Sequence, residues 1–225
     1  RRRNLGPLLP PANAPAIHAP LCWRCPINLE YPACGTACLA ASEELIDQTT
    51  SSEAAAIIAE LPAHVAKVGV FVDADEATIR NTATSAGLDT LQFHGNESPD
   101  FCTQFELRTI KAFRMKDRES LAQLAGYRTD AWLLDSYVQG VPGGTGERFN
   151  WDLAVEANRL GRPILLAGGL TPDNAGEAVD QVAPFGLDVS SGVEAAPGRK
   201  DAAKMATLIA SAKGNSAADG LWTGY

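Results

Sequence analysis

The amino-acid sequence predicts an α/β fold, specifically a (β/α)8 barrel, and three observations support this. Short apolar runs rich in β-branched residues alternate with amphipathic stretches of helical period along most of the chain. The runs are nearly continuously hydrophobic, as parallel strands covered on both faces are. Their starts lie roughly 20 to 30 residues apart, a repeat that fits one strand, one helix and two loops.

Six such units follow one another from about residue 50. The strands are expected over 68–72, 90–94, 109–115, 132–136, 163–170 and 185–193. The helices are expected within 74–87, 98–107, 118–127, 150–160, 171–182 and 197–213. In the fifth unit Thr171 is the expected N-cap and Pro172 the first helical residue. A barrel of eight units therefore needs two more strands, and these should precede residue 50.

The first 49 residues do not have the composition of a strand, a helix and a second strand. They contain seven prolines and four of the five cysteines, with no convincing β-branched run. We therefore divide the chain into an atypical N-terminal segment (1–49), a barrel domain (50–213) and a loose C-terminal tail (214–225).

The composition, 45% hydrophobic and 20% charged residues, is that of an ordinary soluble domain. A net charge of -8 disfavours nucleic acid as a partner, and the run Arg1-Arg2-Arg3 is too short to change that. No apolar run could span a membrane, and the proline-interrupted start lacks the apolar core of a signal peptide. We expect a cytoplasmic protein whose cysteines stay reduced, with no membrane or obligate protein partner.

In an α/β barrel the functional groups follow the strands, so the residues that end each run are the candidates for the site. Two neighbouring strand ends are made of glycine and serine: Gly168 and Gly169 after one strand, and Asp188, Ser190, Ser191 and Gly192 at the next. Backbone N–H groups and helix N-termini bind anions, so a phosphate site is expected there. Each glycine pair could also serve only to allow a tight turn.

Three further residues at strand ends could contact a substrate. Asp135 follows the apolar Trp132-Leu133-Leu134, and it could be a catalytic acid, an exposed acid or a helix cap. His94 could be a substrate contact, a proton carrier or a packed structural residue. Lys111 and Arg114 lie on opposite faces of their strand, and Arg114, nearer the C-terminal end, is the better candidate for the interior.

Four motifs in order, LQFHGNE, LLDSYVQGVPGGTGERFNW, LLAGGLTPDNAGEAV and LDVSSGVEAAPGRKD, resemble the phosphoribosylanthranilate isomerase family of tryptophan biosynthesis. The resemblance covers about residues 50–213. It implies a (β/α)8 barrel that performs an Amadori rearrangement of N-(5-phosphoribosyl)anthranilate. It also implies a phosphorylated small-molecule substrate and no metal or other cofactor.

The resemblance assigns roles to several of these residues. Asp135 matches the family's general acid, which protonates the furanose ring oxygen and so must carry a proton when substrate is bound. An apolar strand end and a nearby substrate carboxylate would both favour the protonated form. The Gly168-Gly169 pair and the DVSSG turn match the phosphate site. The family's general base is a cysteine in a KICG(I/T) motif that ends the first strand.

The KICG motif has no clear counterpart here. Cys34-Gly35-Thr36 has the right letters but stands too close to the strand at 68–72, and the family's usual spacing reaches back to His18 instead. The basic K-S-P-R loop of the family is also missing. Cys34 is thus the base, an inert small hydrophobe, or one ligand of a zinc site formed with Cys22, Cys25 and Cys38. We favour the inert cysteine.

Three functions stay open from the sequence. The site motifs favour a working isomerase. The missing base favours an impaired barrel that still binds phosphorylated sugars. The paired cysteines would allow a zinc-stabilised interaction module.

Overall fold

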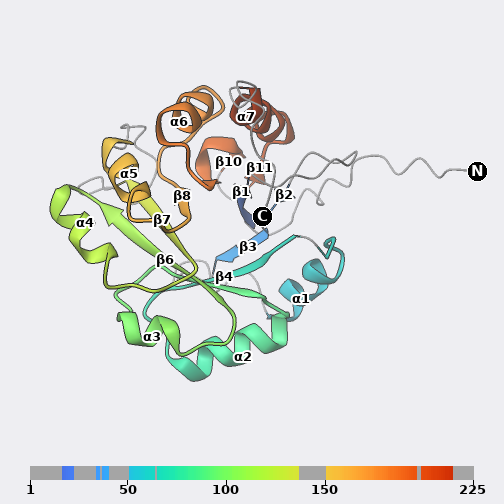
Figure 1. Ribbon diagram of the computed structural model, residues 1–225. Helices are drawn as coiled ribbons and strands as arrows, with labels where there is room; N and C mark the ends of the chain where they lie inside the picture. Colours follow the sequence, from blue (N-terminus) through green and yellow to red (C-terminus); the bar gives the residue numbers. More distant parts are fainter. Residues whose placement is uncertain are drawn as a thin grey trace, which may run out of the picture.

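The computed structural model describes residues 17–22, 34–35, 37–40, 51–63, 65–136, 151–196 and 199–214 (Figure 1). Within these residues the main sheet has nine strands: β1 (Ile17–Cys22), β2 (Cys34–Gly35), β3 (Ala37–Ala40), β4 (Lys67–Phe71), β5 (Thr90–Phe93), β6 (Arg108–Met115), β7 (Ala131–Ser136), β8 (Ile164–Leu166) and β9 (Gly186–Val189). A separate two-stranded hairpin joins β10 (Glu194–Ala196) to β11 (Arg199–Lys200).

The strands from β3 to β9 pair in chain order, and every pair is parallel. The sheet closes because β1 pairs with both β3 and β9. A run of parallel strands that alternate with helices and close into a barrel confirms the predicted (β/α)8 fold class. The six strands expected from residue 50 onward are β4 to β9.

The closing strand differs from a regular barrel strand. β1 runs antiparallel to β9, with Ala19 opposite Val189 and Cys22 opposite Gly186, and it is also antiparallel to β3. The N-terminal segment therefore supplies β1, β2 and β3, although its composition indicated no regular strand. A ladder needs only backbone donors and acceptors, which residues without β-branched side chains also provide, although Pro20 of β1 has no N–H to donate.

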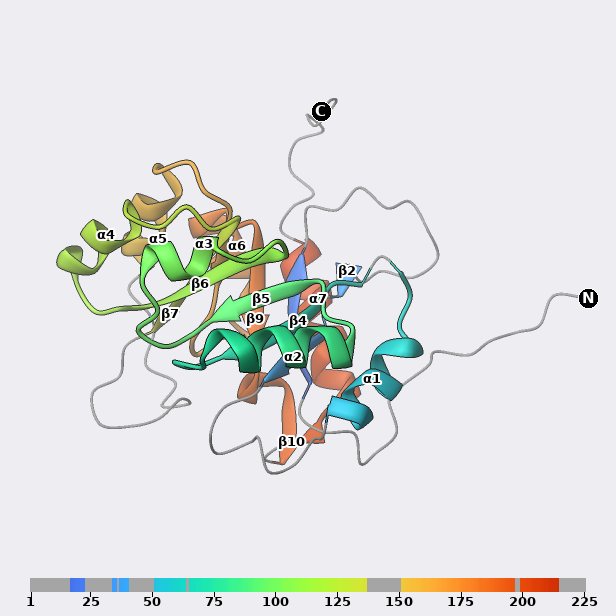
Figure 2. The same ribbon diagram turned by 90° about the horizontal axis from the view of Figure 1, so that it is seen from below.

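Helices cover the outside of the sheet: α1 (Ser51–Ala59), α2 (Glu76–Ala86), α3 (Pro99–Thr103), α4 (Arg118–Leu124), α5 (Trp151–Asn158), α6 (Ala175–Val182) and α7 (Ala202–Gly214). A short 3-10 helix, η2 (Ser191–Val193), follows β9. Local sequence sets several boundaries, because Asp75 caps α2 through Thr78 N and Asp117 forms a capping box with Ser120 at α4. Figure 2 shows α2 lying along the outer side of β4 and β5. None of the described helices is long and apolar enough to cross a lipid bilayer.

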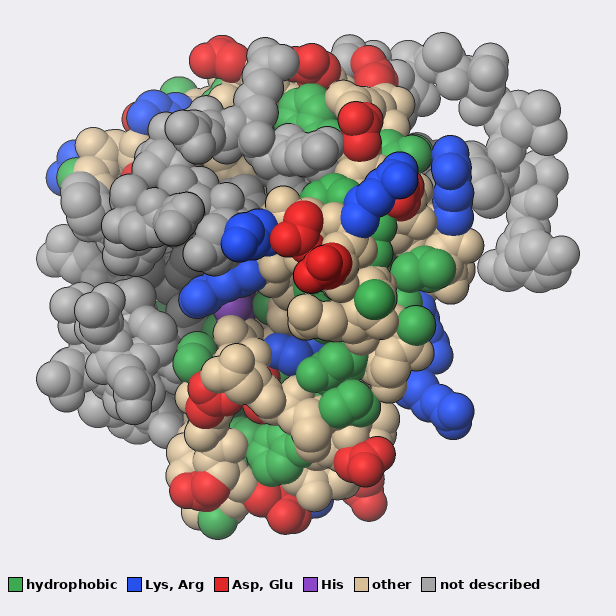
Figure 3. Space-filling model, turned by 90° about the vertical axis from the view of Figure 1, so that its left-hand side faces the viewer, with side chains coloured by type: hydrophobic (Ala, Val, Ile, Leu, Met, Phe, Trp, Pro, Cys, Tyr) green, Lys and Arg blue, Asp and Glu red, His purple; other side chains and the backbone are tan. Residues whose placement is uncertain are grey.

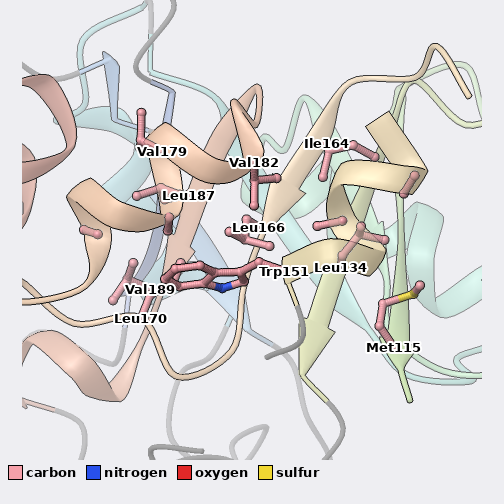
Figure 4. Close-up of a cluster of buried hydrophobic side chains, with 14 of the residues drawn as sticks. Met115, Leu134, Trp151, Ile164, Leu166, Leu170, Val179, Val182, Leu187 and Val189 are labelled. Atoms are coloured by element: carbon pink, nitrogen blue, oxygen red, sulfur yellow. The ribbon is translucent and has the colours of Figure 1, made fainter. Parts of the chain in front are cut away.

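Alternation along the strands separates an inner from an outer core. The inner cluster contains Val68, Val70, Ile110, Ala112, Leu133, Leu165 and Ala167. The larger outer cluster fills the space between β6–β9 and helices α4 to α7, and Trp151 of α5 lies among its aliphatic side chains (Figure 4). Successive residues of a strand face opposite sides, so the next inward positions beyond the inner cluster lie at the rim of the barrel.

Candidate active site

The carboxyl ends of the parallel strands meet at one rim of the barrel, and most of the candidates lie there. They are His94 directly after β5, Arg114 in β6, Asp135 in β7, Gly168 and Gly169 after β8, Asp188 in β9, and Ser190, Ser191 and Gly192 after it. The sequence therefore placed these residues at strand ends correctly, and closure of the sheet brings the ends together.

Arg114 and Asp135 share the inner face of the sheet. They are opposite each other in the β6–β7 register, and Arg114 continues the inward series of Ile110 and Ala112. Lys111 instead lies on the outer face, where it is buried. Arg114 is exposed at the rim, so its guanidinium is accessible to a ligand.

His94 and Asp135 face each other across the rim. His94 Nε2 lies 3.8 Å from Asp135 Oδ2, and both side chains are partly exposed. The other ring nitrogen of His94, Nδ1, lies 3.3 Å from Gln92 Nε2. The backbone N–H of His94 donates to Phe71 O at 2.8 Å. An imidazole beside a carboxyl group forms a pair that can hold or pass a proton.

The two glycine-containing loops pack against each other, and their backbones need glycine. Gly168 and Gly169 have φ of 82° and 65°, in the left-handed region. A Cβ on Gly192 would lie 1.9 Å from Leu170 O, in the loop after β8. Only glycine allows this approach, so the two strand ends form one continuous backbone surface.

An asparagine side chain fixes the first of these loops. Asn174 Oδ1 accepts from Thr171 N at 2.8 Å, and its Nδ2 donates to Gly169 O at 2.9 Å. Helix α6 begins only at Ala175, so the predicted start at Thr171 and Pro172 is too early. The residues before Ala175 form a turn, because the Asn174 side chain bonds back to the loop instead of capping the helix.

The second loop is held by a residue that sequence reasoning missed. Lys200 Nζ donates to Ser190 O at 3.0 Å and lies 2.8 Å from Glu194 Oε1. Lys200 comes from the β10–β11 hairpin, which the sequence did not predict because both strands are very short. Its signal in the sequence is the GRKD end of the last motif, which lies within the stretch predicted to be helical.

Asp188 is the group at the rim whose acidity changes most clearly. Burial is the main cause that raises the pKa of its carboxyl to about 6, and the charge of Asp135 raises it further. His94 and Lys200 act in the opposite direction. These four groups therefore interact electrostatically at the rim.

The register places Cys34 away from this rim. In β2, Cys34 is opposite Cys22 of β1, and Cys22 is also opposite Gly186, the first residue of β9. Asp188 lies two residues further along β9, toward its carboxyl end. Cys34 is thus level with the amino-terminal end of β9, and Thr36 lies outside the described residues.

The other cysteines have different environments. Cys25, which the zinc hypothesis requires together with Cys22, Cys34 and Cys38, lies outside the described residues. Cys102 of α3 is buried in the outer core, as its sequence position predicts. Burial raises the pKa of its thiol to about 11, so Cys102 stays protonated and inert.

Comparisons with known proteins give one answer. Residues 35–211 match the family model described as N-(5′-phosphoribosyl)anthranilate (PRA) isomerase. A protein of Geobacter sulfurreducens named N-(5′-phosphoribosyl)anthranilate isomerase is 53% identical over 165 residues, which cover 73% of this chain and 81% of the relative. The family match begins ahead of residue 50, where the recognisable motifs start.

Solved structures agree with the sequence match. The crystal structure of phosphoribosyl anthranilate isomerase from Thermotoga maritima has a TM-score of 0.73 at 34% identity, and the match covers 79% of this chain and 87% of that one. A structure of the isomerase in complex with reduced 1-(o-carboxyphenylamino)-1-deoxyribulose 5-phosphate has a TM-score of 0.70 at 32% identity, covering 79% and 86%.

Proposed function

This chain belongs to the N-(5′-phosphoribosyl)anthranilate isomerase family, and we propose that it converts N-(5-phosphoribosyl)anthranilate to 1-(2-carboxyphenylamino)-1-deoxyribulose 5-phosphate in tryptophan biosynthesis. One observation carries the proposal: an imidazole and two carboxyl groups, His94, Asp135 and Asp188, adjoin two glycine loops at one rim. The rearrangement needs an anion site, a proton donor and a proton acceptor, and this rim offers groups suited to the first two.

The loops after β8 and β9 are the proposed phosphate site. Gly168, Gly169, Ser190, Ser191 and Gly192 supply backbone N–H groups and hydroxyls without bulky side chains. Such backbone cradles bind phosphate in many barrels. The Gly192 contact with the neighbouring loop supports this assignment, because it holds the two backbones together as one surface.

Asp135 is the proposed general acid. Its proton would pass to the furanose ring oxygen, and the ring C–O bond would break to leave an open-chain iminium. The side chain follows a buried apolar stretch, Leu133-Leu134, and lies beside His94, which could orient it or return its proton. The proposed substrate contacts are His94, Arg114 and Asp188. The positive charge of Arg114 suits it to pair with the anthranilate carboxylate.

The base that removes the C2 proton of the iminium is the open part of the mechanism. Cys34 is the candidate because Cys34-Gly35-Thr36 matches the Cys-Gly-Thr part of the family motif. Its position in the register, away from the rim, instead favours a second function: an impaired barrel that binds the substrate and turns it over slowly. General acid–base catalysis is worth about 10² to 10⁴-fold per group, so loss of the base should lower turnover by that order.

The partner and the location also remain proposals. We propose a free phosphorylated small molecule as the substrate, with neither nucleic acid nor membrane as a partner, in the cytoplasm. Among the described residues on the face shown in Figure 3, acidic and basic side chains are interspersed, an arrangement that does not favour a polyanion.

The test is a turnover assay that follows the loss of fluorescent phosphoribosylanthranilate. We expect Asp135→Asn to abolish turnover, and Asp100→Asn, a change at an exposed acid of α3, to leave it unchanged. Cys34→Ala should change it little. Family-like rates that Cys34→Ala destroys and Cys22→Ala spares would show that Cys34 is the base. Turnover that survives Asp135→Asn would refute the proposed acid.

A further inference from the structure

A buried ion pair binds the backbone on either side of His94, the residue whose imidazole faces Asp135. Lys111 Nζ and Glu97 Oε2 are 3.2 Å apart, and only 4% and 3% of their side chains are exposed. The pair lies on the outer face of β6, beside the turn that connects β5 to α3. The proposed mechanism does not use it, although it is the most deeply buried ion pair among the described residues.

Glu97 holds two neighbouring turns together. Its Oε1 accepts from Asp73 N at 2.9 Å, in the turn after β4. Both of its carboxylate oxygens accept from Gly95 N, at 3.2 and 3.0 Å. The Glu97 backbone is fixed as well, because Tyr127 Oη donates to its carbonyl at 2.9 Å.

Lys111 binds the same turn through carbonyl groups. Its Nζ donates to Gly95 O at 2.8 Å and to Phe93 O at 3.3 Å, with a further contact to Ala112 O at 3.1 Å. Phe93 and Gly95 are the residues on either side of His94. The ion pair therefore fixes the backbone before and after the imidazole.

The cost of burying two charges makes a purely stabilising role a weak explanation. Replacing a buried ion pair by uncharged groups of similar size is often neutral or stabilising. What an uncharged replacement of Lys111 cannot reproduce here is the set of bonds that its ammonium group donates to Phe93 O and Gly95 O. The pair is thus suited to set the position of a turn, in the way that an outer layer of contacts orients catalytic groups.

We propose that Glu97 and Lys111 are positioning residues for His94, holding its imidazole against Asp135 in the orientation the isomerase reaction needs. The inference rests on the proposed function for its effect on turnover, and on the geometry alone for its effect on His94. A displacement of about 1 Å at a reacting group can cost about 10²-fold in rate.

The experiment uses the double variant Glu97→Gln/Lys111→Met in the full chain. Gln keeps an acceptor for Asp73 N and Gly95 N, so the fold should survive. Met removes the bonds that Lys111 Nζ donates to Phe93 O and Gly95 O, on either side of His94. The matched control is Arg108→Met, which removes an exposed ion pair with Asp89 from the same strand. We expect the double variant to lose 10- to 100-fold in kcat/KM, and Arg108→Met to lose less than twofold.

Two readouts separate positioning from general stability. In a His94→Ala background the double substitution should cause no further loss, because residues acting through one group are not additive. The imidazole NMR signals of His94, assigned through His94→Ala, should shift in the double variant and stay unchanged in Arg108→Met. The proposal would be overturned if the double substitution lowered kcat/KM by the same factor in the His94→Ala background as in the wild type. Unchanged His94 signals in the double variant would also overturn it.

The NMR readout needs no turnover, so it decides the inference even if the isomerase assay fails. If the double variant does not fold, Tyr127→Phe tests the same turn by removing one hydroxyl, and it should shift the His94 signals by a smaller amount. Unshifted signals in a folded Tyr127→Phe would then count against the proposal.

Discussion

At the scale of single residues, the backbone packing and the acidity of the rim depend on individual positions such as Gly192 and Asp188. Gly192 lies against a backbone carbonyl, and a carbonyl cannot swing aside as the end of a flexible side chain can. Asp188 is partly buried near Asp135, and burial first and the charge of Asp135 second raise the pKa of its carboxyl. Each of these positions makes a prediction of its own.

Gly192→Ala should separate the two glycine loops. A Cβ 1.9 Å from Leu170 O has to push the backbones apart, and overpacking of this kind costs about 1–3 kcal/mol. We expect a lower free energy of unfolding in urea and weaker binding of the reduced product analogue in calorimetry. Gly126→Ala, whose new Cβ would meet only ordinary contacts from 3.6 Å, is the control. Equal effects of the two substitutions would show that the loop contact is unimportant.

Asp188→Asn should change how stability depends on pH. The native pKa of about 6 lies above the ordinary value of 3.8, so the native state holds its proton more tightly than the unfolded state. Below pH 3.8 the carboxyl is protonated in both states and costs nothing, whereas its cost grows as pH rises from 3.8 to about 6 and is constant above that. Relative to wild type, Asp188→Asn should gain about 2–3 kcal/mol between pH 4 and pH 7 in the free energy of unfolding, most of it below pH 6. A difference that stays constant over this range would contradict the assignment.

At the scale of elements, the last strand and the hairpin after it act together. The chain passes from β9 through η2 into the β10–β11 hairpin, and Lys200 of the hairpin returns to bind Ser190 O. Glu194 accepts from the same ammonium group, so the lysine is held from two sides. The hairpin thus fixes the carbonyl at the start of the proposed phosphate turn.

Lys200→Met should loosen that turn while the barrel stays folded. The stem of the side chain is kept and only the ammonium bonds are lost, which costs about 1–3 kcal/mol for charged hydrogen bonds. We expect at least a fivefold weaker affinity for inorganic phosphate, measured by calorimetry. Lys204→Met, which removes an exposed bond to the Glu194 carbonyl, is the matched control. Undiminished phosphate affinity in Lys200→Met would show that the hairpin does not support the turn.

The elements that the sequence predicted best are those whose own residues determine them. The apolar runs of β4 to β9 and the helical period of α2 and α4 need no distant information. The hairpin was missed because strands of two or three residues have no detectable period. The start of α6 was placed too early because Asn174 bonds to Gly169 and Thr171, a contact that composition does not reveal.

At the scale of the whole molecule, closure of the sheet decides which strand ends meet. The sequence predicted the rim because parallel strands in chain order must place their ends together. It could not predict β1, since an antiparallel strand that pairs with β2, β3 and β9 depends on pairings between distant residues. The Lys111–Glu97 pair escaped notice for the same reason: only the fold brings the two residues into contact.

The last prediction concerns the stability of the whole barrel with ligand bound. A ligand that binds only the native state stabilises it by about 2.7 kcal/mol at a hundred times its Kd. For a domain of this size that corresponds to a rise of roughly 5 to 10 °C in Tm. We expect inorganic phosphate, and more strongly the reduced product analogue, to raise the Tm in a thermal shift assay. Gly169→Asp and Ser191→Asp each place a negative charge in the proposed phosphate site, so both should remove the rise, whereas Asp135→Asn should keep the rise with phosphate because it leaves the loops intact. A rise with phosphate that both loop variants retain would locate the anion elsewhere on the molecule.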